Sequence, residues 1–378
     1  MADFFFYGTL CHAPLLQVVA GRTVDLVPAT LAGHAVYWAE GRAFPMIVAE
    51  SGARAEGLLA RGLTEDEVAR LDYYEGGFAY EARSVQLTAR GVRQDARVYF
   101  PDVSELAPGA PWRLADWVAR MGDIAVLAAA RFMRGYGTVP QAAARARYPS
   151  LLVEAAAELR ARHAAPATRR HAAREGDVTV AALAQPYAAF FAVREYDLSH
   201  RRFDGTMSET MRRAVFVSGD AATVLPYDPV RDRVLLIEQF RAGPFGRGDA
   251  QPWMLEPIAG RIDPGETPEE AAHREAQEEA GLTLGALWKV AQYYPTPGIA
   301  AEYLYSYVGI ADLPDGAAGV HGIAEEHEDI RSHVVSFDRL MALMDSGEVQ
   351  NAPLILTVQW LALHRARLRA EAGAMPVT

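Results

Sequence analysis

Residues 259–282, AGRIDPGETPEEAAHREAQEEAGL, gather acidic side chains at a spacing that suits metal chemistry. Glu275 precedes Glu278 by three residues and Glu279 by four, so a helix would place all three carboxylates on one face. Like charges at that spacing repel by roughly 0.2–0.5 kcal/mol per pair. Clustered carboxylate oxygens are the ligands that Mg²⁺ prefers. We interpret the stretch as a divalent-cation site, the alternative being a solvated acidic helix face.

Local signals predict the elements that carry these carboxylates. Pro264 and Gly265 indicate a turn between a strand ending near Ile258 and a following helix. Pro268 suits the first turn of that helix, and Gly281 suits its end. The expected unit is therefore strand, turn and acidic helix.

The fixed positions of this stretch resemble the Nudix box. They are Gly260, Glu266 and the run REAQEEAGL over residues 274–282. From about Val178 onward the chain resembles the ADP-ribose pyrophosphatase branch of the Nudix hydrolases. Four stretches carry this resemblance: MRRAVFVSGDAATVLPYDPVRDRVLLIEQFR, LEPIAGRIDPGE, YPTPGIAAE and HGIAEEHEDIRSHVV. Close relatives in this branch, and similar fusions, are named for tellurite resistance.

The resemblance implies roles for the acidic residues. Family members use several Mg²⁺ ions, with Mn²⁺ as an alternative, to ready a pyrophosphate for attack by water. The implied metal ligands are Glu275, Glu278, Glu279, Glu328 and the backbone carbonyl of Ala259. Arg274 and Glu266 would orient those carboxylates.

A general base is expected from the loop IAEEHEDI, which offers Glu325, Glu326 and Glu328. The resemblance aligns Glu326 with the family's base and Glu328 with a further metal ligand. An exposed acidic loop is the alternative interpretation.

Substrate contacts are also implied by the resemblance. Arg213 and Arg241 align with arginines that bind the phosphates, Phe190 with an aromatic that stacks on adenine, and Glu302 with a ribose or metal-water contact. Phe190 is alternatively a core residue. In this branch the segment before the Nudix core reaches across a homodimer, so Phe190 and Arg213 would serve the partner's site. The loop GPFGRGDAQPW is one residue longer than the family leads us to expect.

The N-terminal part contains a second set of motifs. YGTL, residues 7–10, ends a buried strand and exposes successive backbone amides, which suit a carboxylate. With FPMIVAE and LDYYEGGFAYEAR it resembles the gamma-glutamylcyclotransferase-like family. The resemblance implies that Glu75 is the acid/base and that Tyr7, Gly8, Thr9 and Leu10 hold the glutamyl group.

The pattern of elements predicts an α+β protein in three parts. Short strand signals fill the first 100 residues, interrupted by a helix whose N-cap is Thr64 with Glu67 three residues later. Residues 112–175 are rich in Ala and Arg and predict helices. We expect a cyclotransferase-like β-barrel with helices at 1–110, a helical connector at 111–176 and a Nudix α/β/α sandwich at 177–378.

Composition and charge limit the partners and the cellular compartment that the sequence predicts. The net charge of −11 argues against a nucleic-acid partner, and no apolar run is long enough for a membrane span. The N-terminus shows no export signal, and a single cysteine, Cys11, fits a reducing cytoplasm.

The sequence as a whole predicts Mg²⁺-dependent hydrolysis of ADP-ribose to AMP and ribose 5-phosphate by a homodimer. The N-terminal domain would release 5-oxoproline from gamma-glutamyl substrates. The alternatives are hydrolysis of another nucleoside-diphosphate sugar or a dinucleotide, an ADP-ribose sensor with little turnover, and an N-terminal binding module.

Overall fold

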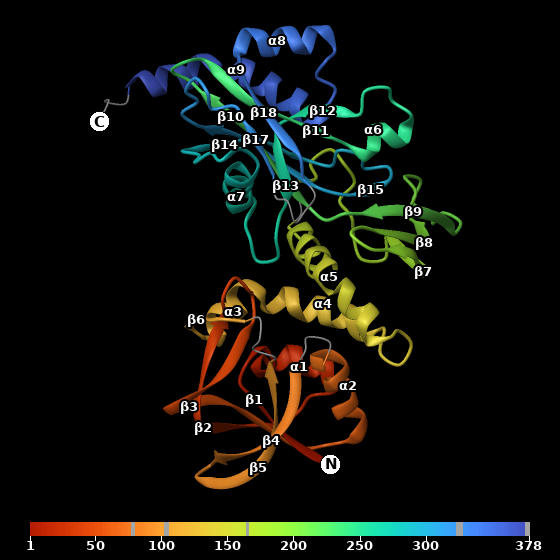
Figure 1. Cartoon of the computed structure of the whole chain (residues 1–378). Helices are drawn as coiled ribbons and strands as arrows, with labels where there is room; N and C mark the ends of the chain where they lie inside the picture. Colours follow the sequence, from red (N-terminus) through yellow and green to blue (C-terminus); the bar gives the residue numbers. More distant parts are fainter. Residues whose placement is uncertain (77–79, 102–105, 164–165, 323–327, 375–378) are drawn as a thin grey trace. The chain divides into compact units, whose positions relative to one another are not determined.

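The computed structural model of the chain describes residues 1–76, 80–101, 106–163, 166–322 and 328–374. The chain divides into two compact units, Met1–Ala167 and Thr168–Thr378, each with its own core (Figure 1). Within the described ranges, no helix combines the length and the apolar character that a membrane crossing requires. The α+β fold class is confirmed.

The first unit is built on a closed barrel. Its strands follow the order β3-β1-β5-β4-β2, and β2 pairs with β3 to close the ring, while β6 extends from β2. The elements of this unit are β1 (Ala2–Phe6), η1 (Thr9–Cys11), α1 (Ala13–Ala20), β2 (Leu26–Ala39), β3 (Pro45–Leu63), α2 (Glu65–Glu75), β4 (Tyr80–Ala89), β5 (Val92–Pro101), β6 (Pro108–Pro111), α3 (Leu114–Trp117), η4 (Val118–Gly122), α4 (Asp123–Met133) and α5 (Gln141–Ala161).

Strand β3 is longer than the short strand signals of the sequence indicated. The short runs FPMIVAE and EGLLARG belong to one continuous strand, β3, which pairs with β2 along most of its length and with β1 near its end. Closure of the barrel requires long strands that bend, because one strand must pair on both sides. The expected helix α2 is confirmed, including the capping box between Thr64 and Glu67.

The apolar run of β1 is buried on both faces. Phe4 and Phe6 pack against the helices, whereas Phe5 and the following Tyr7 point into the barrel. Successive side chains of a strand point to opposite faces, and both faces of β1 are buried. The sequence therefore shows no polar positions here.

The helices of residues 114–161 belong to this first unit. Trp117, Phe132, Tyr148 and Leu151 lie in the same core cluster as Phe4. The sequence led us to expect a separate connector at 111–176, but the unit boundary falls after Ala167. The apolar side chains of these helices, which are hard to place by sequence pattern in an Ala-rich segment, account for the difference.

Where the structure describes it, the second unit contains two sheets and three longer helices. Its elements are β7 (Val178–Ala188), β8 (Ala192–His200), β9 (Met211–Val217), β10 (Ala221–Asp228), β11 (Arg233–Phe240), α6 (Ala242–Arg247), β12 (Trp253–Glu256), β13 (Ile258–Arg261), α7 (Pro268–Ala280), β14 (Leu287–Tyr293), β15 (Ala300–Ala301), β16 (Leu304–Ile310), β17 (Val320–His321), β18 (Ile330–Ser336), α8 (Phe337–Ser346) and α9 (Ala352–Ala374).

The larger sheet is covered by helices on both faces, which confirms the expected sandwich (Figure 1). Its strands run β14-β16-β10-β11-β18-β17, with β12 on β11 and β13 on β10. Leu235 and Ile237 of β11 face α7, while Val234 and Leu236 face α8 and α9. A smaller sheet of order β15-β9-β8-β7 precedes and joins this core.

Candidate active sites

Helix α7 and strand β13 bring the acidic motif together. The helix begins after Thr267, which forms a capping box with Glu270, and it ends at Gly281 in the left-handed conformation. Strand β13 continues to Arg261, beyond the end expected near Ile258, and a break at Pro257 separates it from β12. Proline cannot donate to a strand ladder, which explains the break.

Two carboxylates of α7 point back to β13. The backbone N–H of Ala259 donates to Glu279 Oε2 over 3.0 Å, and Glu275 packs against Gly260. Both side chains are almost fully buried. Burial raises the pKa of Glu275 to about 7 and that of Glu279 to about 8, and the charge of Glu328 adds to both shifts.

Arg274 holds the other acidic groups in place. Its Nη1 donates to Glu275 Oε1 at 2.7 Å and to Glu278 Oε2 at 2.9 Å. Its Nε and Nη2 each contact a different oxygen of Glu266 at 3.0 Å. Nη2 also donates to the carbonyl of Arg261 over 3.0 Å. One guanidinium therefore fixes three carboxylates relative to strand β13, using its planar set of donors.

Groups outside the motif surround these carboxylates. Electrostatic influence on Glu275 and Glu279 comes from Glu328, which precedes β18. Arg241 also interacts electrostatically with Glu279 and Glu328. Glu325 and Glu326, the latter expected as the base, fall outside the described residues.

Arg241 is positioned by a residue that sequence reasoning missed. Its Nε and Nη2 donate to Glu256 Oε2 at 2.8 and 2.6 Å, and Asn351 donates to the other oxygen, Oε1, at 2.9 Å. Glu256 lies in the stretch LEPIAG, but only the pairing of β12 with β11 brings it beside Arg241.

The remaining expected substrate residues are Phe190, Glu302 and Arg213, and of these Glu302 is close enough to Arg241 to feel its charge. Phe190 is exposed and carries the guanidinium of Arg261 3.8 Å from its ring centre, so it is not a core residue. Glu302 accepts a 3.5 Å hydrogen bond from Ser218, and burial raises its pKa. Arg213 lies exposed on β9, where it donates to the carbonyl of Arg212.

The carboxylates of α7 have the chemistry of a cation site. Within the described ranges, no three His, Cys, Asp or Glu side chains already stand in a metal-binding arrangement. Glu279, however, is almost fully buried, and the backbone N–H of Ala259 donates to it. A buried carboxylate of that kind needs either a proton or a cation. The donor set of α7 therefore fits a hard divalent ion.

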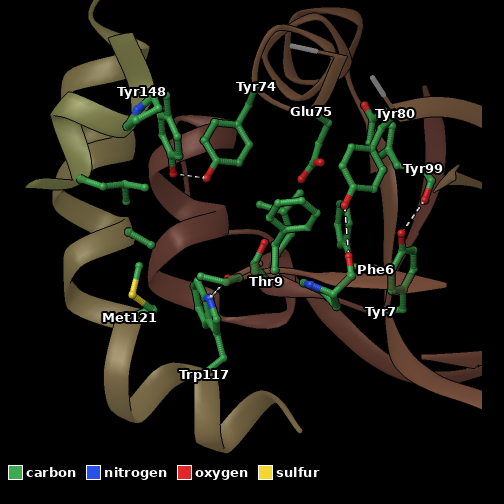
Figure 2. A pocket seen from close by; sticks show the side chains of 18 of the residues that line it. Phe6, Tyr7, Thr9, Tyr74, Glu75, Tyr80, Tyr99, Trp117, Met121 and Tyr148 are labelled. Carbon is green, nitrogen blue, oxygen red and sulfur yellow. Dashed lines mark hydrogen bonds between the residues drawn. The ribbon is translucent and has the colours of Figure 1, made fainter. Parts of the chain in front are cut away.

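The first unit contains a separate cavity of about 270 Å³ between the barrel and the helices (Figure 2). All four residues of the YGTL motif line it. Gly8 lies against Pro45, where a β-carbon would come within 2.7 Å of the proline ring. The aromatic residues that line the cavity are Phe5, Phe6, Tyr7, Phe44, Tyr74, Tyr80, Tyr99, Trp117 and Tyr148.

Glu75 ends helix α2 and points into this cavity between Tyr74 and Tyr80 (Figure 2). Burial raises the pKa of its carboxyl to about 7. The cavity brings together all five sequence-predicted residues of the first unit. Sequence reasoning missed its aromatic lining, although the tyrosines of LDYYEGGFAYEAR were a signal for it.

The geometry of the second unit, a sandwich with an acidic helix set against a glycine-bearing strand, defines the class of Nudix hydrolases. Family models agree with this assignment. A model described as NUDIX domain matches residues 217–372, and one described as Gamma-glutamyl cyclotransferase, AIG2-like matches residues 4–119.

Curated relatives match the second unit. ADP-ribose pyrophosphatase of Escherichia coli (strain K12) is 42% identical over 197 residues, which is 52% of this chain and 93% of that protein. ADP-ribose pyrophosphatase of Haemophilus influenzae is 36% identical over 185 residues, 48% of this chain and 85% of that protein. GDP-mannose pyrophosphatase of Enterobacter sp. (strain 638) is 30% identical over 178 residues, 46% of this chain and 89% of that protein. The chain therefore belongs to the Nudix hydrolases, with a gamma-glutamyl cyclotransferase-like domain fused at its N-terminal side.

Proposed function

We propose that the second unit hydrolyses the pyrophosphate of ADP-ribose with Mg²⁺, giving AMP and ribose 5-phosphate. The observation that carries the proposal is the pair of buried carboxylates, Glu275 and Glu279, that α7 directs toward β13. Relatives named ADP-ribose pyrophosphatase support the choice of substrate. Bound Mg²⁺ would neutralise phosphate oxygens and lower the pKa of the attacking water.

Each acidic residue has a proposed part in this reaction. Glu275, Glu278, Glu279, Glu328 and the carbonyl of Ala259 would hold the metal. Arg274 and Glu266 would orient these ligands, as their hydrogen bonds indicate. Glu326 would take the proton from the attacking water.

The substrate's two ends would be held by different elements. Arg241, oriented by Glu256, would bind the phosphates, together with Arg213, and Glu302 would bind the ribose. Phe190 would stack on adenine through the ring face that Arg261 leaves open.

A homodimer is proposed because the smaller sheet leaves apolar side chains exposed. Val178 and Leu183 of β7 are 58% and 48% exposed, and Phe190 is 67% exposed. Large exposed apolar groups on one element are typical of protein interfaces. The net charge of −11 and the single cysteine support a cytoplasmic enzyme whose partners are neither nucleic acids nor membranes.

The metal assignment is tested with Glu279→Gln in a magnesium titration. Loss of a metal carboxylate should lower hydrolysis of ADP-ribose by at least about 100-fold. Glu371→Gln, an exposed position on α9, is the matched control. Unchanged hydrolysis by the Glu279 variant would contradict the proposal.

Substrate choice is tested with a panel of ADP-ribose, ADP-glucose, GDP-mannose and NADH. GDP-mannose belongs in the panel because some relatives carry that name. The fastest turnover should be that of ADP-ribose. Tight binding of ADP-ribose with no turnover would instead favour a sensor.

A second activity is proposed for the first unit because Glu75 points into the cavity that the YGTL motif lines. The α-amino nitrogen of a gamma-glutamyl substrate would attack its own side-chain carbonyl, forming the five-membered ring of 5-oxoproline. The bond to the leaving amine breaks, and Glu75 carries the proton from the attacking nitrogen to the leaving one. Glu75→Gln should abolish 5-oxoproline release. If the unmodified protein releases none, the domain is a binding module.

A further inference from the structure

The wall opposite Glu75 comes largely from outside the region that resembles the cyclotransferase family. The family match ends at residue 119, whereas α4 and α5 extend to Ala161. Met121, Ala125, Tyr148 and Leu152 from this later segment line the cavity. The family match therefore does not cover these residues of the wall.

This wall is apolar and held by ring contacts. The hydroxyls of Tyr74 and Tyr148 bond to each other at 2.8 Å, joining α2 to α5. Phe132 packs edge-on against both rings, with centroids 5.7 and 5.5 Å away. Trp117 donates its indole N–H to the carbonyl of Ala43 at 3.1 Å (Figure 2). These contacts fix the positions of the rings at the wall.

The tyrosine hydroxyls on the barrel side donate to the protein. Tyr7 donates to the carbonyl of Tyr99, Tyr80 to that of Pro45, and Tyr99 to Asp72. With those protons committed, the tyrosines offer a ligand mainly their ring faces. The cavity therefore recognises apolar and aromatic groups more readily than polar ones.

The described lining contains a single charged side chain, Glu75, and no Arg, Lys or His. His12 contacts Trp117 edge-on but is not among the lining residues. Residues 77–79 and 102–105, which the structure does not describe, are GFA and DVSE and also hold no basic residue. A ligand with two carboxylates would find the YGTL amides for one and no cation for the other.

We propose that the first unit acts on gamma-glutamyl amides of hydrophobic amines, with an aromatic or branched group and no carboxylate in the leaving amine. This inference rests on the cyclotransferase activity proposed above. The glutamyl head would lie between Glu75 and the YGTL segment, and the amine's side chain would lie against Trp117, Met121 and Tyr148. Cyclisation releases the free amine and 5-oxoproline without consuming water.

A matched pair of substrates tests the inference directly. Gamma-glutamylphenethylamide and gamma-glutamylphenylalanine differ only by one carboxylate on the leaving amine. We expect kcat/KM for the amide to be higher by at least about 10-fold, because a buried carboxylate would lack a partner. Glutathione should be a poorer substrate than the amide. Equal or faster turnover of gamma-glutamylphenylalanine or glutathione would overturn the inference while leaving the cyclotransferase activity standing.

Leu152→Arg provides a second measurement by placing a cation at the wall, with Leu152→Met as the matched control. The arginine should lower the ratio of kcat/KM for the amide to kcat/KM for gamma-glutamylphenylalanine by about 10-fold. Methionine should leave this ratio as it is. A preference that Leu152→Arg leaves intact, in a variant whose melting temperature shows that it folds, would contradict the assignment of the wall.

Failure of the two proposals is distinguishable. If none of these compounds yields 5-oxoproline, the cyclotransferase activity is wrong, and calorimetric binding of the same pair then tests the pocket alone. Stronger binding of the amide than of the acid supports the wall's selectivity. Equal binding, or stronger binding of the acid, overturns it.

Discussion

The carboxylate of Glu275 lies directly against the α-carbon of Gly260, so that a β-carbon at position 260 would come within 1.8 Å of Oε1. Glycine is required at this place by contact with a side chain, not by a left-handed backbone. The glycine of the motif thus has a steric reason: the helix can direct a carboxylate onto the strand only if the strand has no side chain there.

Gly260→Ala should therefore displace Glu275 and lower ADP-ribose hydrolysis by at least about 100-fold. Steady-state kinetics at saturating Mg²⁺ measure the effect. Gly246→Ala is the matched control, because a β-carbon there meets no atom within 4 Å. Activity of Gly260→Ala close to that of the unmodified protein would show that Glu275 has room to move without loss.

Arg274→Lys should weaken the arrangement of three carboxylates that one guanidinium now contacts. An ammonium group is a point charge and cannot reproduce the planar set of donors. We expect the Mg²⁺ concentration at half-maximal activity to rise by about 10-fold and the free energy of unfolding to fall by about 1–3 kcal/mol. Metal titration and chemical denaturation measure these changes. Arg247→Lys, at an exposed ion pair with Asp249, should change neither.

Activity of the first unit should depend on pH through Glu75. Its folded pKa of about 7 lies above the ordinary value of 4.5, because burial favours the protonated form. Release of 5-oxoproline requires the ionised base, so kcat/KM should rise as pH increases through about 7.

The same group has the opposite effect on stability. A raised folded pKa gives a contribution that is full below pH 4.5 and is lost as pH rises through 7. Glu75→Gln should remove that part of the pH dependence of the melting temperature, whereas Glu40→Gln, an exposed control, should leave it unchanged. An identical pH profile for Glu75→Gln and the unmodified protein would contradict the assignment.

Phe190→Leu should raise KM for ADP-ribose by about 10-fold with a smaller change in kcat. Stacking of a base on an aromatic ring contributes about 1–3 kcal/mol, and leucine offers no such face. Phe203→Leu is the control, since Phe203 is completely exposed. If KM is unchanged in Phe190→Leu, the stack with Arg261 serves the protein's own structure and not the substrate.

Local signals were sufficient to predict the elements of the acidic motif. Pro268 and Gly281 mark the ends of α7 as the sequence indicated, and Thr64 caps α2. These features depend on residues within a few positions of one another. The sandwich and the barrel were predicted by resemblance, which carries long-range information that one sequence's periodicity lacks.

Contacts between distant residues could not be predicted in the same way. The pairing of Arg241 with Glu256 depends on strand register, and the stack of Arg261 on Phe190 joins residues 71 positions apart. The helices of residues 114–161 were assigned to a connector because Ala-rich sequence shows weak amphipathic pattern. Only tertiary packing reveals that Tyr148 belongs beside Tyr74.

One hydrophobic core contains residues from Phe4 to Ala156, and it determines where the gene could recombine with another gene without splitting a folded unit. A recombination point after residue 167 would transfer the barrel together with the helices that pack against it. The transferred unit would then keep its apolar side chains buried. A recombination point near residue 110 would instead separate Trp117 and Tyr148 from the residues they pack against, and both fragments would expose apolar surface. The favoured boundary for gene fusion in this protein therefore lies after residue 167, well past residue 119, where the cyclotransferase family match ends.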